Sequence, residues 1–374
     1  MSEWKELSSI TSKIGSGLTP RGGNSVYTDN GISLIRSQNV LDMDFSTENL
    51  AYIDEVQAEK LKNVIVEKND ILLNITGDSI ARCTIVPEEI LPARVNQHVS
   101  IIRCKNTEQS KYVMYYLQYI KKYLLQISKV GGTRNALTKE AISKLPIKIS
   151  EDWNRISTIL DNIDRKIKIN NQINLELEAM AKILYDYWFV QFDFPDQNGK
   201  PYKSSGGKMV YNPELKREIP EGWGVEKLRD FCQYVSEKVD SSELNIENYV
   251  GTDNMIEDMG GIELTTSIPK SGTSTKFSVG DILISNIRPY FKKIWLSDRT
   301  GGCSADVLCI RTKKIIPKEF VYATLARDDF FNYDVAGSKG SKMPRGDKKH
   351  IMVYPVVFEF GIVEQYSEIV KPIY

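Results

Sequence analysis

The sequence predicts a mixed α/β (α+β) protein in which one domain architecture occurs twice, with a long coiled-coil-like helix between the two copies. Three observations carry this prediction. Similar segments recur in the same order about 210 residues apart, a long run without Pro or Gly has a heptad pattern, and a polar, turn-rich run follows it. Short apolar runs of β type, mixed with helical segments, predict the mixed class.

The repeat is visible in paired segments. "NDILLNITGDSIARC" from Asn69 corresponds to "GDILISNIRPYFKKI" from Gly280, and "NQHVSIIRC" from Asn96 corresponds to "SADVLCIRT" from Ser304. A constant order at a nearly constant offset indicates a duplicated architecture. The predicted divisions are a first domain over 1–150, a long spacer helix over 151–192, a linker over 193–222, a second domain over 223–358 and the start of a second long helix over 359–374.

The spacer helix is predicted from Asn154 to Phe189, where steps of four and three residues alternate along an apolar seam. The seam consists of Ile156, Leu160, Ile163, Ile167, Asn170, Asn174, Leu177, Ala181, Leu184 and Trp188. Asn inside such a seam can fix register and partner. A helix of this length spans roughly 50 Å and could hold two domains apart. An ordinary amphipathic helix on a globular core is the alternative.

Composition narrows the class of protein. Lys plus Arg and Asp plus Glu both number 49, so the net charge is zero and DNA binding, if present, depends on local charge distribution. Five cysteines without a C-x-x-C pair predict reduced thiols in a cytoplasmic protein. The sequence contains no apolar run long enough to span a membrane and no apolar signal core near its first residues.

Catalytic signatures are absent from the sequence. There is no Walker phosphate loop, and the glycines of "KIGSGLTPRGG" from Lys13 do not have dinucleotide-binding spacing. The sequence has no Asn/Asp-Pro-Pro-aromatic tetrad, the usual site of amino-methylating enzymes, and only two histidines, His98 and His350. We therefore expect no catalytic site, no metal site and no bound cofactor.

The chain resembles the specificity subunits of type I restriction-modification systems over nearly its whole length. The matching motifs are "LIRSQNV" (34–40), "GGTRNALTKEAISKLPI" (131–147), "FDFPDQNGKPYKSSGGKMVYNPELKREIPEGW" (192–223), "YVGTDNM" (249–255), "GDILISNIRPYFKKIW" (280–295) and "GSKMPRGDKKHI" (340–351). The resemblance implies two target recognition domains that each read half of a bipartite, gapped DNA target. It also implies modification (methyltransferase) subunits docked on the helices, and restriction subunits docked on those. S-adenosylmethionine, ATP and Mg²⁺ would belong to these partners.

Candidate DNA-contact residues follow from the chemistry of base reading, since Arg pairs with guanine and Asn or Gln with adenine. In the first copy the candidates are Arg36, Gln38, Asn39, Arg82, Arg94, Gln97, Thr133, Arg134 and Asn135. In the second copy they are Asn254, Arg288, Tyr290, Lys292, Lys293, Lys339, Lys342 and Arg345. For several of these, such as Arg36 and Gln38, the polar face of a strand is the alternative. We assign His98 to the core.

Members of the resembled family usually end in a second long helix, and here only its first turns are expected. The unpaired seam, from Ile156 to Trp188, would then favour self-association or dependence on a modification subunit. Three alternatives stay open: a silent or rearrangeable specificity cassette, a nuclease or methyltransferase carrying recognition domains, and a coiled-coil scaffold that binds proteins rather than DNA.

Overall fold

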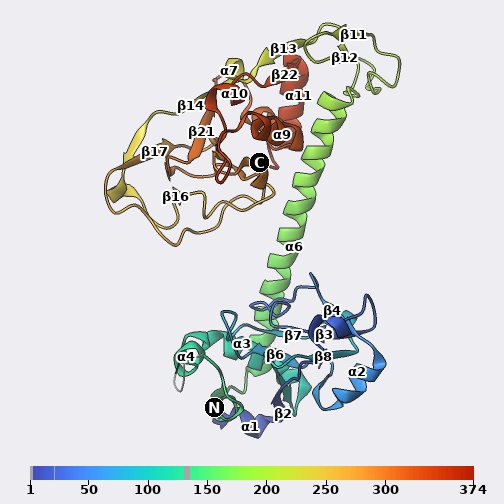
Figure 1. The fold of residues 1–374 in the computed structure, drawn as a ribbon, viewed down its shortest axis with the longest axis vertical. Helices are drawn as coiled ribbons and strands as arrows, with labels where there is room; N and C mark the ends of the chain where they lie inside the picture. The colour runs from blue at the N-terminus through green and yellow to red at the C-terminus, as the bar shows by residue number, and fades with distance from the viewer. Residues whose placement is uncertain (1–2, 21, 130–134) are drawn as a thin grey trace. The chain divides into compact units, whose positions relative to one another are not determined.

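The computed structural model describes residues 3–20, 22–129 and 135–374. The chain forms two compact units, Met1–Ile169 and Asn170–Tyr374, and each contains sheets covered by helices (Figure 1). The predicted mixed class, with two sheet-rich regions and a long helix, is confirmed. No helix in the described part of the chain is long and apolar enough to cross a membrane.

The first unit is built on two four-stranded sheets. The main sheet has the order β2 (Thr11–Ser16), β9 (Val99–Cys104), β6 (Ile71–Asn74), β7 (Cys83–Ile85), and all its neighbours are antiparallel. The second sheet has the order β4 (Ala51–Ile53), β3 (Ile32–Ile35), β8 (Ala93–Val95), β5 (Ile65–Val66), with β3 and β8 parallel. A separate antiparallel pair joins β1 (Glu3–Glu6) to β10 (Pro146–Ile149).

Side chains that alternate between the two faces of the main sheet contribute to two separate hydrophobic cores, one on each face. Ile71 and Leu73 of β6 pack toward the helices, whereas Leu72 packs toward the second sheet. Side chains point to opposite faces with a period of two, so one short apolar strand serves both cores. The helices of this unit are α1 (Leu7–Ile10), α2 (Glu55–Lys60), α3 (Ser110–Tyr119), α4 (Lys121–Ile127) and α5 (Lys139–Ser143).

The second unit repeats the strand order of the main sheet, and its second sheet keeps a parallel pair, which lies at an edge rather than in the middle. Its main sheet has the order β14 (Cys232–Tyr234), β21 (Val307–Thr312), β18 (Ile282–Ser285), β19 (Ile294–Leu296). Its second sheet contains β15 (Lys238–Asp240), β17 (Thr273–Phe277), β20 (Gly301–Cys303) and β16 (Tyr249–Val250), with β16 and β20 parallel like β3 and β8. The pair β13 (Gly224–Lys227) and β22 (Pro355–Phe358) corresponds to β1 and β10.

The helices of the second unit are α7 (Leu228–Phe231), α8 (Lys318–Leu325), α9 (Asp328–Gly337), α10 (Lys348–Ile351) and α11 (Phe360–Val370). The turn-rich run that precedes β13 folds back as a hairpin of β11 (Met209–Asn212) and β12 (Arg217–Pro220). Part of the predicted linker is therefore ordered structure within the second unit.

A buried ion pair occurs at matching positions of the two main sheets. Arg103 of β9 donates two hydrogen bonds of 2.8 Å to the carboxylate of Asp70, which lies just before β6. Arg311 of β21 donates two hydrogen bonds of 2.8 Å to Asp281 before β18 in the same way. Hydrogen bonding to these carboxylates raises the pKa of both guanidinium groups. The repeat thus preserves a bidentate pair as well as the strand order.

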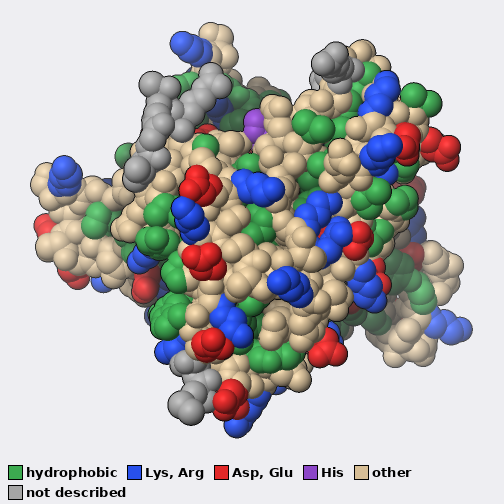
Figure 2. Space-filling view, turned by 90° about the horizontal axis from the view of Figure 1, so that it is seen from below, with side chains coloured by type: hydrophobic (Ala, Val, Ile, Leu, Met, Phe, Trp, Pro, Cys, Tyr) green, Lys and Arg blue, Asp and Glu red, His purple; other side chains and the backbone are tan. Residues whose placement is uncertain are grey.

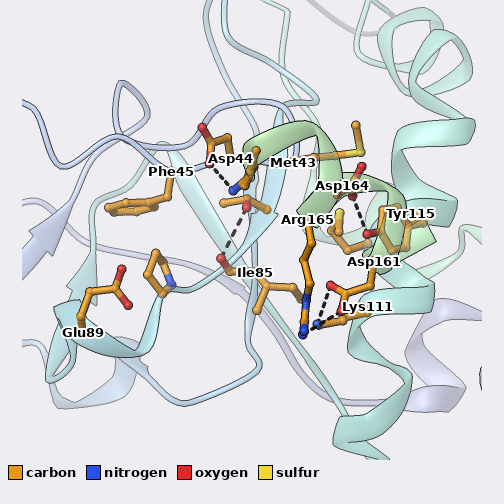
Figure 3. Close-up of a pocket in the computed structure, with 14 residues that line it drawn as sticks. Met43, Asp44, Phe45, Ile85, Glu89, Lys111, Tyr115, Asp161, Asp164 and Arg165 are labelled. Carbon is orange, nitrogen blue, oxygen red and sulfur yellow. Dashed lines mark hydrogen bonds and ion pairs between the residues drawn. The ribbon is translucent and has the colours of Figure 1, made fainter. Parts of the chain in front are cut away.

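The long helix α6 runs from Trp153 to Tyr185 and continues into one π-helical turn, η5 (Asp186–Val190). Its first turns are held to the first unit by polar contacts around a pocket of about 320 Å³ (Figure 3). Lys111 of α3 pairs with Asp161 at 2.6 Å, and the Tyr115 hydroxyl donates to Asp164 at 2.5 Å. Lys168 pairs with Asp44 at 2.7 Å. Charge and hydrogen bonding therefore link this end of α6 to its unit.

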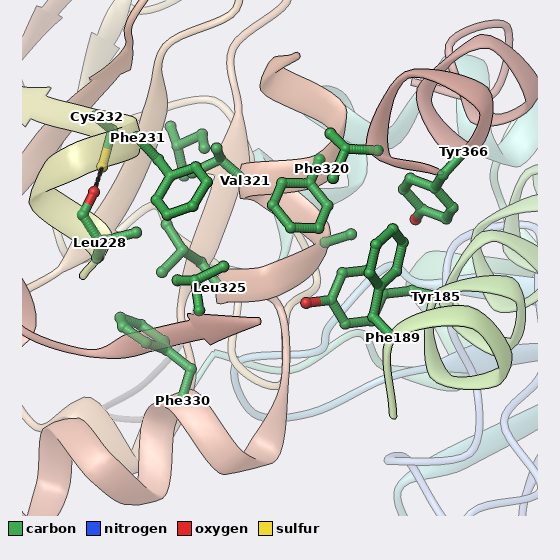
Figure 4. Close-up of a cluster of buried hydrophobic side chains, with 14 of the residues drawn as sticks. Tyr185, Phe189, Leu228, Phe231, Cys232, Phe320, Val321, Leu325, Phe330 and Tyr366 are labelled. Atoms are coloured by element: carbon green, nitrogen blue, oxygen red, sulfur yellow. Dashed lines mark hydrogen bonds between the residues drawn. The ribbon is translucent and has the colours of Figure 1, made fainter. Parts of the chain in front are cut away.

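The last turns of α6 are part of the core of the second unit (Figure 4). Tyr185 and Phe189 pack with Phe320 of α8, and the Tyr366 hydroxyl of α11 donates to the Ala181 carbonyl at 3.2 Å. Trp188 is buried there and lies edge-on to Tyr366. The prediction that Trp188 binds a partner protein is wrong, because α11 of the same chain already covers it.

The repeated ion pair generates a prediction about stability. Asp70→Ala and Asp281→Ala should each lower the free energy of unfolding by about 3 kcal/mol, because each leaves a partly buried guanidinium unpaired. Denaturant unfolding measures the loss, and hydrogen exchange in β9 or β21 assigns it to one unit. Glu59→Ala is the control, since its ion pair with Lys62 is exposed. A loss no larger than in this control would contradict the stabilising role of the pair.

Candidate nucleic-acid interface

Charge is mixed on one face of the protein. Lys and Arg side chains are interspersed with Asp and Glu on the face drawn in Figure 2. This distribution agrees with the formal net charge of zero. On this face a site for nucleic acid would be a local arrangement of loops rather than one broad basic surface.

The first unit has an open hollow of about 910 Å³ that is lined mostly by polar side chains. Loops that follow β3 and β6, a segment before β9 and a segment before α5 all contribute to it. The hollow is lined by Ser37, Gln38, Thr76, Gly77, Asp78, Ser79, Arg82, His98, Asn135 and Ala136. Three predicted contact residues, Gln38, Arg82 and Asn135, thus meet at one site although they are far apart in the sequence.

His98 belongs to this hollow, and its assignment to the core is corrected. The side chain is half-buried, and its Nδ1 lies 2.6 Å from the Thr76 hydroxyl oxygen. The side chain of exposed Gln97 contacts the other ring nitrogen at 3.3 Å. The sequence suggested a core position for His98 because the residue occurs in a run of β type. The polar residue before it, Gln97, was the signal that could have placed His98 at the surface.

Two asparagines that were predicted to contact DNA instead hold their own loops. Asn39 is fully buried, and its Oδ1 accepts from the backbone N–H of Arg36 at 3.0 Å. Its Nδ2 donates to the carbonyls of Ser46 and Glu48. Asn254 repeats this pattern, since its Oδ1 accepts from the N–H of Gly251 at 2.7 Å. Both amides are occupied within the fold, so neither can read a base in this conformation.

Arg94 is also interior, with only 8% of its surface exposed. It donates to the carbonyls of Ala58 and Ala93, and burial lowers the pKa of its guanidinium. Arg36 is half-buried, donates to the Asn49 carbonyl and lies over the ring of Tyr27. Arg36 therefore borders the loop that carries Gln38, while Arg94 supports the interior. Thr133 and Arg134 lie outside the described residues.

In the second unit two loops carry most of the predicted cations. Arg288 and Lys292 have positive φ angles of 49° and 51° and flank a tight turn, η7 (Pro289–Phe291), whose Tyr290 is exposed. The N–H of Arg288 donates to the Pro344 carbonyl at 2.8 Å, and Ile287 pairs with Arg345 in a single β-bridge. These contacts bring the loop around 288–293 against the loop that contains Arg345.

Several of these cations have carboxylate partners at the surface. Lys292 pairs with Asp328 at 2.7 Å, Lys339 with Asp347 at 2.6 Å, and Arg345 with Asp306 at 3.2 Å. Lys293 instead donates to the Thr252 carbonyl at 3.0 Å. Lys342 is exposed on the same loop as Arg345. Exposed ion pairs are worth little, so a phosphate can replace the carboxylate at small cost.

A buried pair of oxygens lies beneath the Arg345 loop. The Oδ1 atoms of Asn286 and Asp334 are both buried, and neither has a hydrogen-bond partner among the described residues. A Cβ at Gly346 would lie 2.4 Å from Asp334 Oδ1 and 2.9 Å from Asn286 Oδ1, so both oxygens face this glycine. Burial raises the pKa of Asp334 to about 6, although nearby His350 opposes the shift. Within the described residues, no group of three or more His, Cys, Asp or Glu side chains could hold a metal ion.

Fold and loops together define a class: a duplicated two-unit protein in which each unit presents a polar loop surface. Comparison with known proteins is consistent with this class. Residues 5–179 match the family model described as the type I restriction modification DNA specificity domain. The first half of the chain is therefore similar to the DNA specificity domains of type I restriction-modification systems.

Two relatives illustrate the similarity. The chain is 32% identical over 151 residues to the type I restriction enzyme MjaIX specificity subunit of Methanocaldococcus jannaschii. This match covers 39% of this chain and 32% of that protein. It is also 25% identical over 221 residues to the type I restriction enzyme HindI specificity subunit of Haemophilus influenzae. That match covers 58% of this chain and 46% of that protein. The matched regions thus span less than half the length of these relatives.

The fold is also similar to a solved structure. The type I restriction-modification S subunit from M. genitalium aligns with a TM-score of 0.53 at 12% identity, covering 100% of this chain and 89% of that chain. At this identity the match concerns the fold alone, and it agrees with the mixed helix and sheet architecture.

The buried carboxyl of Asp334 generates a prediction about pH. Its folded-state pKa of about 6 exceeds its ordinary value of 3.8, so the folded protein retains a proton that the unfolded chain releases. The contribution of this carboxyl to stability should therefore be greatest below about pH 4, fall between about pH 4 and pH 6, and stay level above that range. Asp334→Asn should abolish this fall and add roughly 3 kcal/mol at pH 7.5. Calorimetric unfolding from acid to neutral pH measures both effects.

Asp329→Asn is the matched control for this prediction, because its side chain is exposed on the same helix, α9. It should leave the pH dependence in place. If Asp334→Asn and the parent protein lose stability equally across this range, the carboxyl is not the titrating group.

Proposed function

We propose that this chain is the DNA specificity component of a type I restriction-modification complex. Each unit reads one half of a bipartite, gapped target, and the chain itself performs no chemistry. The observation that carries the proposal is the polar hollow of the first unit. It lies within the residues matched by the DNA specificity domain and gathers side chains from loops that are distant in sequence.

The side chains of the hollow suit base edges. Gln38 and Asn135 each offer an amide donor and acceptor, which matches adenine, while the Arg82 guanidinium matches guanine. We include Arg36 and Gln97 at its margin, and leave Asn39 and Arg94 out because they are occupied inside the fold. Thr133 and Arg134, which lie outside the described residues, stay predicted contacts. A hollow of this kind combines positioning contacts with base readout, as sequence recognition requires.

The second half-site is assigned to the two adjoining loops of the second unit. The proposed contacts are Arg288, Tyr290, Lys292, Lys293, Lys339, Lys342 and Arg345. Phosphates can replace the surface carboxylates that now pair with Lys292, Lys339 and Arg345. Because the loops of the two units differ in sequence, the two half-sites should differ as well. We assign the target recognition domains to 1–150 and 223–358.

The surface of α6 is the proposed site for modification subunits. Its exposed apolar side chains are Ile156, Ile159, Ile163, Ile167, Ile169, Ile173, Leu175, Met180 and Ile183. Leu160, Leu177 and Leu184 of the predicted seam are half-buried, while Asn170 and Asn174 are exposed. An apolar surface of this length favours a protein partner or a second copy of the chain. S-adenosylmethionine, ATP and Mg²⁺ are assigned to the modification and restriction subunits.

The recognition role can be tested by methylome sequencing of cells that express the chain with its neighbouring modification subunit. We expect a gapped, two-part methylated motif. Gln38→Ala and Arg82→Ala should weaken or relax one half by about tenfold, because each removes a base-edge contact. Arg345→Ala should affect the other half. Lys62→Ala, an exposed change outside the hollow, is the control. A contiguous motif, or identical effects of all variants, would contradict the assignment.

The role of the helix can be tested with the double variant Ile163→Asp/Ile167→Asp. Both side chains are about half exposed, so the folded chain should tolerate the change. Binding to the modification subunit, measured by calorimetry, should weaken at least about tenfold because charges would be buried in the interface. Light scattering reports self-association in parallel. Lys166→Ala on the same helix is the control, and unchanged binding and assembly of the double variant would rule out this surface.

A further inference from the structure

The turn-rich run between the long helix and the second domain contains a packed aromatic group. Phe194 stacks on Tyr202 with ring centroids 4.7 Å apart, and Trp223 lies 4.9 Å from Phe194. Phe194 is buried, whereas Tyr202 and Trp223 are only half-buried. Part of each of these two rings therefore stays open to solvent. The recognition of DNA proposed above uses none of the three.

The polar residues of this run hold the aromatic group in place. Both carboxylate oxygens of Asp193 accept from Ser204, one from its backbone N–H at 2.7 Å and one from its hydroxyl at 2.6 Å. Gly206 has a φ of 89°, and a Cβ at Gly207 would lie 2.4 Å from the Tyr202 ring. Gly206 and Gly207 thus allow the chain to wrap closely around Tyr202. A segment built in this way presents a fixed surface.

A pocket of about 560 Å³ lies between this aromatic group and the beginning of α11. Phe194, Tyr202 and Trp223 contribute to its lining together with three carboxylates, those of Asp196, Glu221 and Glu359, and it is lined by no Lys or Arg. Its volume is in the range of sites that take small groups.

The three carboxylates are positioned by the fold. Asp196 Oδ1 accepts from the N–H groups of Asn198 and Lys200, and Glu359 Oε2 accepts from the N–H of Ile362 at 2.8 Å. Glu221 pairs with the exposed ammonium of Lys208 at 2.6 Å. The backbone bonds of Asp196 and Glu359 use one carboxylate oxygen each, and the surface pair of Glu221 is exchangeable.

We propose that this pocket binds the guanidinium of an exposed arginine on a partner protein. Aromatic faces attract cations, and guanidinium combines ring stacking with hydrogen bonds to carboxylates. The same run already contains one such contact, since the Arg217 guanidinium lies 4.9 Å from the centroid of the Phe192 ring. The negative charge of the lining repels phosphate, so a nucleic acid is not the occupant. The proposal is independent of the DNA contacts assigned to the two units.

The test is a titration of the full-length chain with acetyl-arginine amide, observed at the indole N–H signal of Trp223 by NMR. Trp223→Phe assigns that signal. Acetyl-citrulline amide is the neutral control ligand of nearly identical shape. We expect a saturable shift with a dissociation constant of roughly millimolar size for the arginine probe. The citrulline probe should bind at least about fivefold more weakly, because it lacks the charge that the carboxylates and rings attract.

Asp196→Asn/Glu359→Gln is the informative variant. It removes two charges and keeps the oxygens that accept from the backbone, so the fold should survive, which thermal unfolding checks. Its affinity for the arginine probe should fall at least about fivefold. Asp240→Asn, which alters a similar backbone-bonded carboxylate elsewhere in the same unit, should leave the affinity unchanged.

Three results would overturn the proposal. One is the absence of a saturable shift with the arginine probe, and another is equal binding of the arginine and citrulline probes, which would indicate an apolar pocket without charge selectivity. The third is a shift of the Trp223 signal by a duplex oligonucleotide that competes with the arginine probe, which would make the pocket a nucleic-acid site.

Discussion

The bidentate pair between an aspartate before one central strand and an arginine on its neighbour is the constraint on which each unit depends. Asp70 with Arg103, and Asp281 with Arg311, fix the register of the main sheet at the same place in both copies. In each copy the aspartate also accepts a backbone N–H from three residues earlier. The residue before it, Asn69 or Gly280, has a positive φ. The chain therefore enters β6 and β18 by the same tight turn.

Two of the loops that form the proposed recognition surface leave the far ends of these same strands, β6 and β18. The loop after β6 contributes Thr76 and Arg82 to the hollow, and the loop after β18 carries Arg288. A second feature is repeated in both copies: the side chains of Asn39 and Asn254 accept a hydrogen bond from the backbone of their own loop. The two units thus share the hydrogen bonds that stabilise their sheets and loops, whereas the exposed loop side chains differ. Loop sequences can therefore vary without loss of the sheet.

The long helix has different surroundings along its length. Charged and polar contacts to Lys111, Tyr115 and Asp44 hold its first turns. Aromatic packing with Phe320 and Tyr366 holds its last turns, where apolar burial dominates. Between these ends the exposed isoleucines are not confined to the predicted heptad seam, since Ile159, Ile169 and Ile173 lie outside it. The helix is thus held by its own chain at both ends, and its exposed middle is the surface proposed above for partner proteins.

The sequence by itself determined the duplicated mixed architecture and the long helix, because strand alternation, turn residues and helical periodicity are local patterns that survive in each copy. It also identified Gln38, Arg82 and Asn135 as polar loop residues. Only the tertiary structure decided which polar residues meet. It placed His98 beside Thr76 in the hollow, buried Asn39, Arg94 and Asn254, and covered Trp188 with α11. The physical reason is that a side chain's exposure depends on backbone groups far away in sequence, which compete with solvent and ligands for its hydrogen bonds and for its apolar surface.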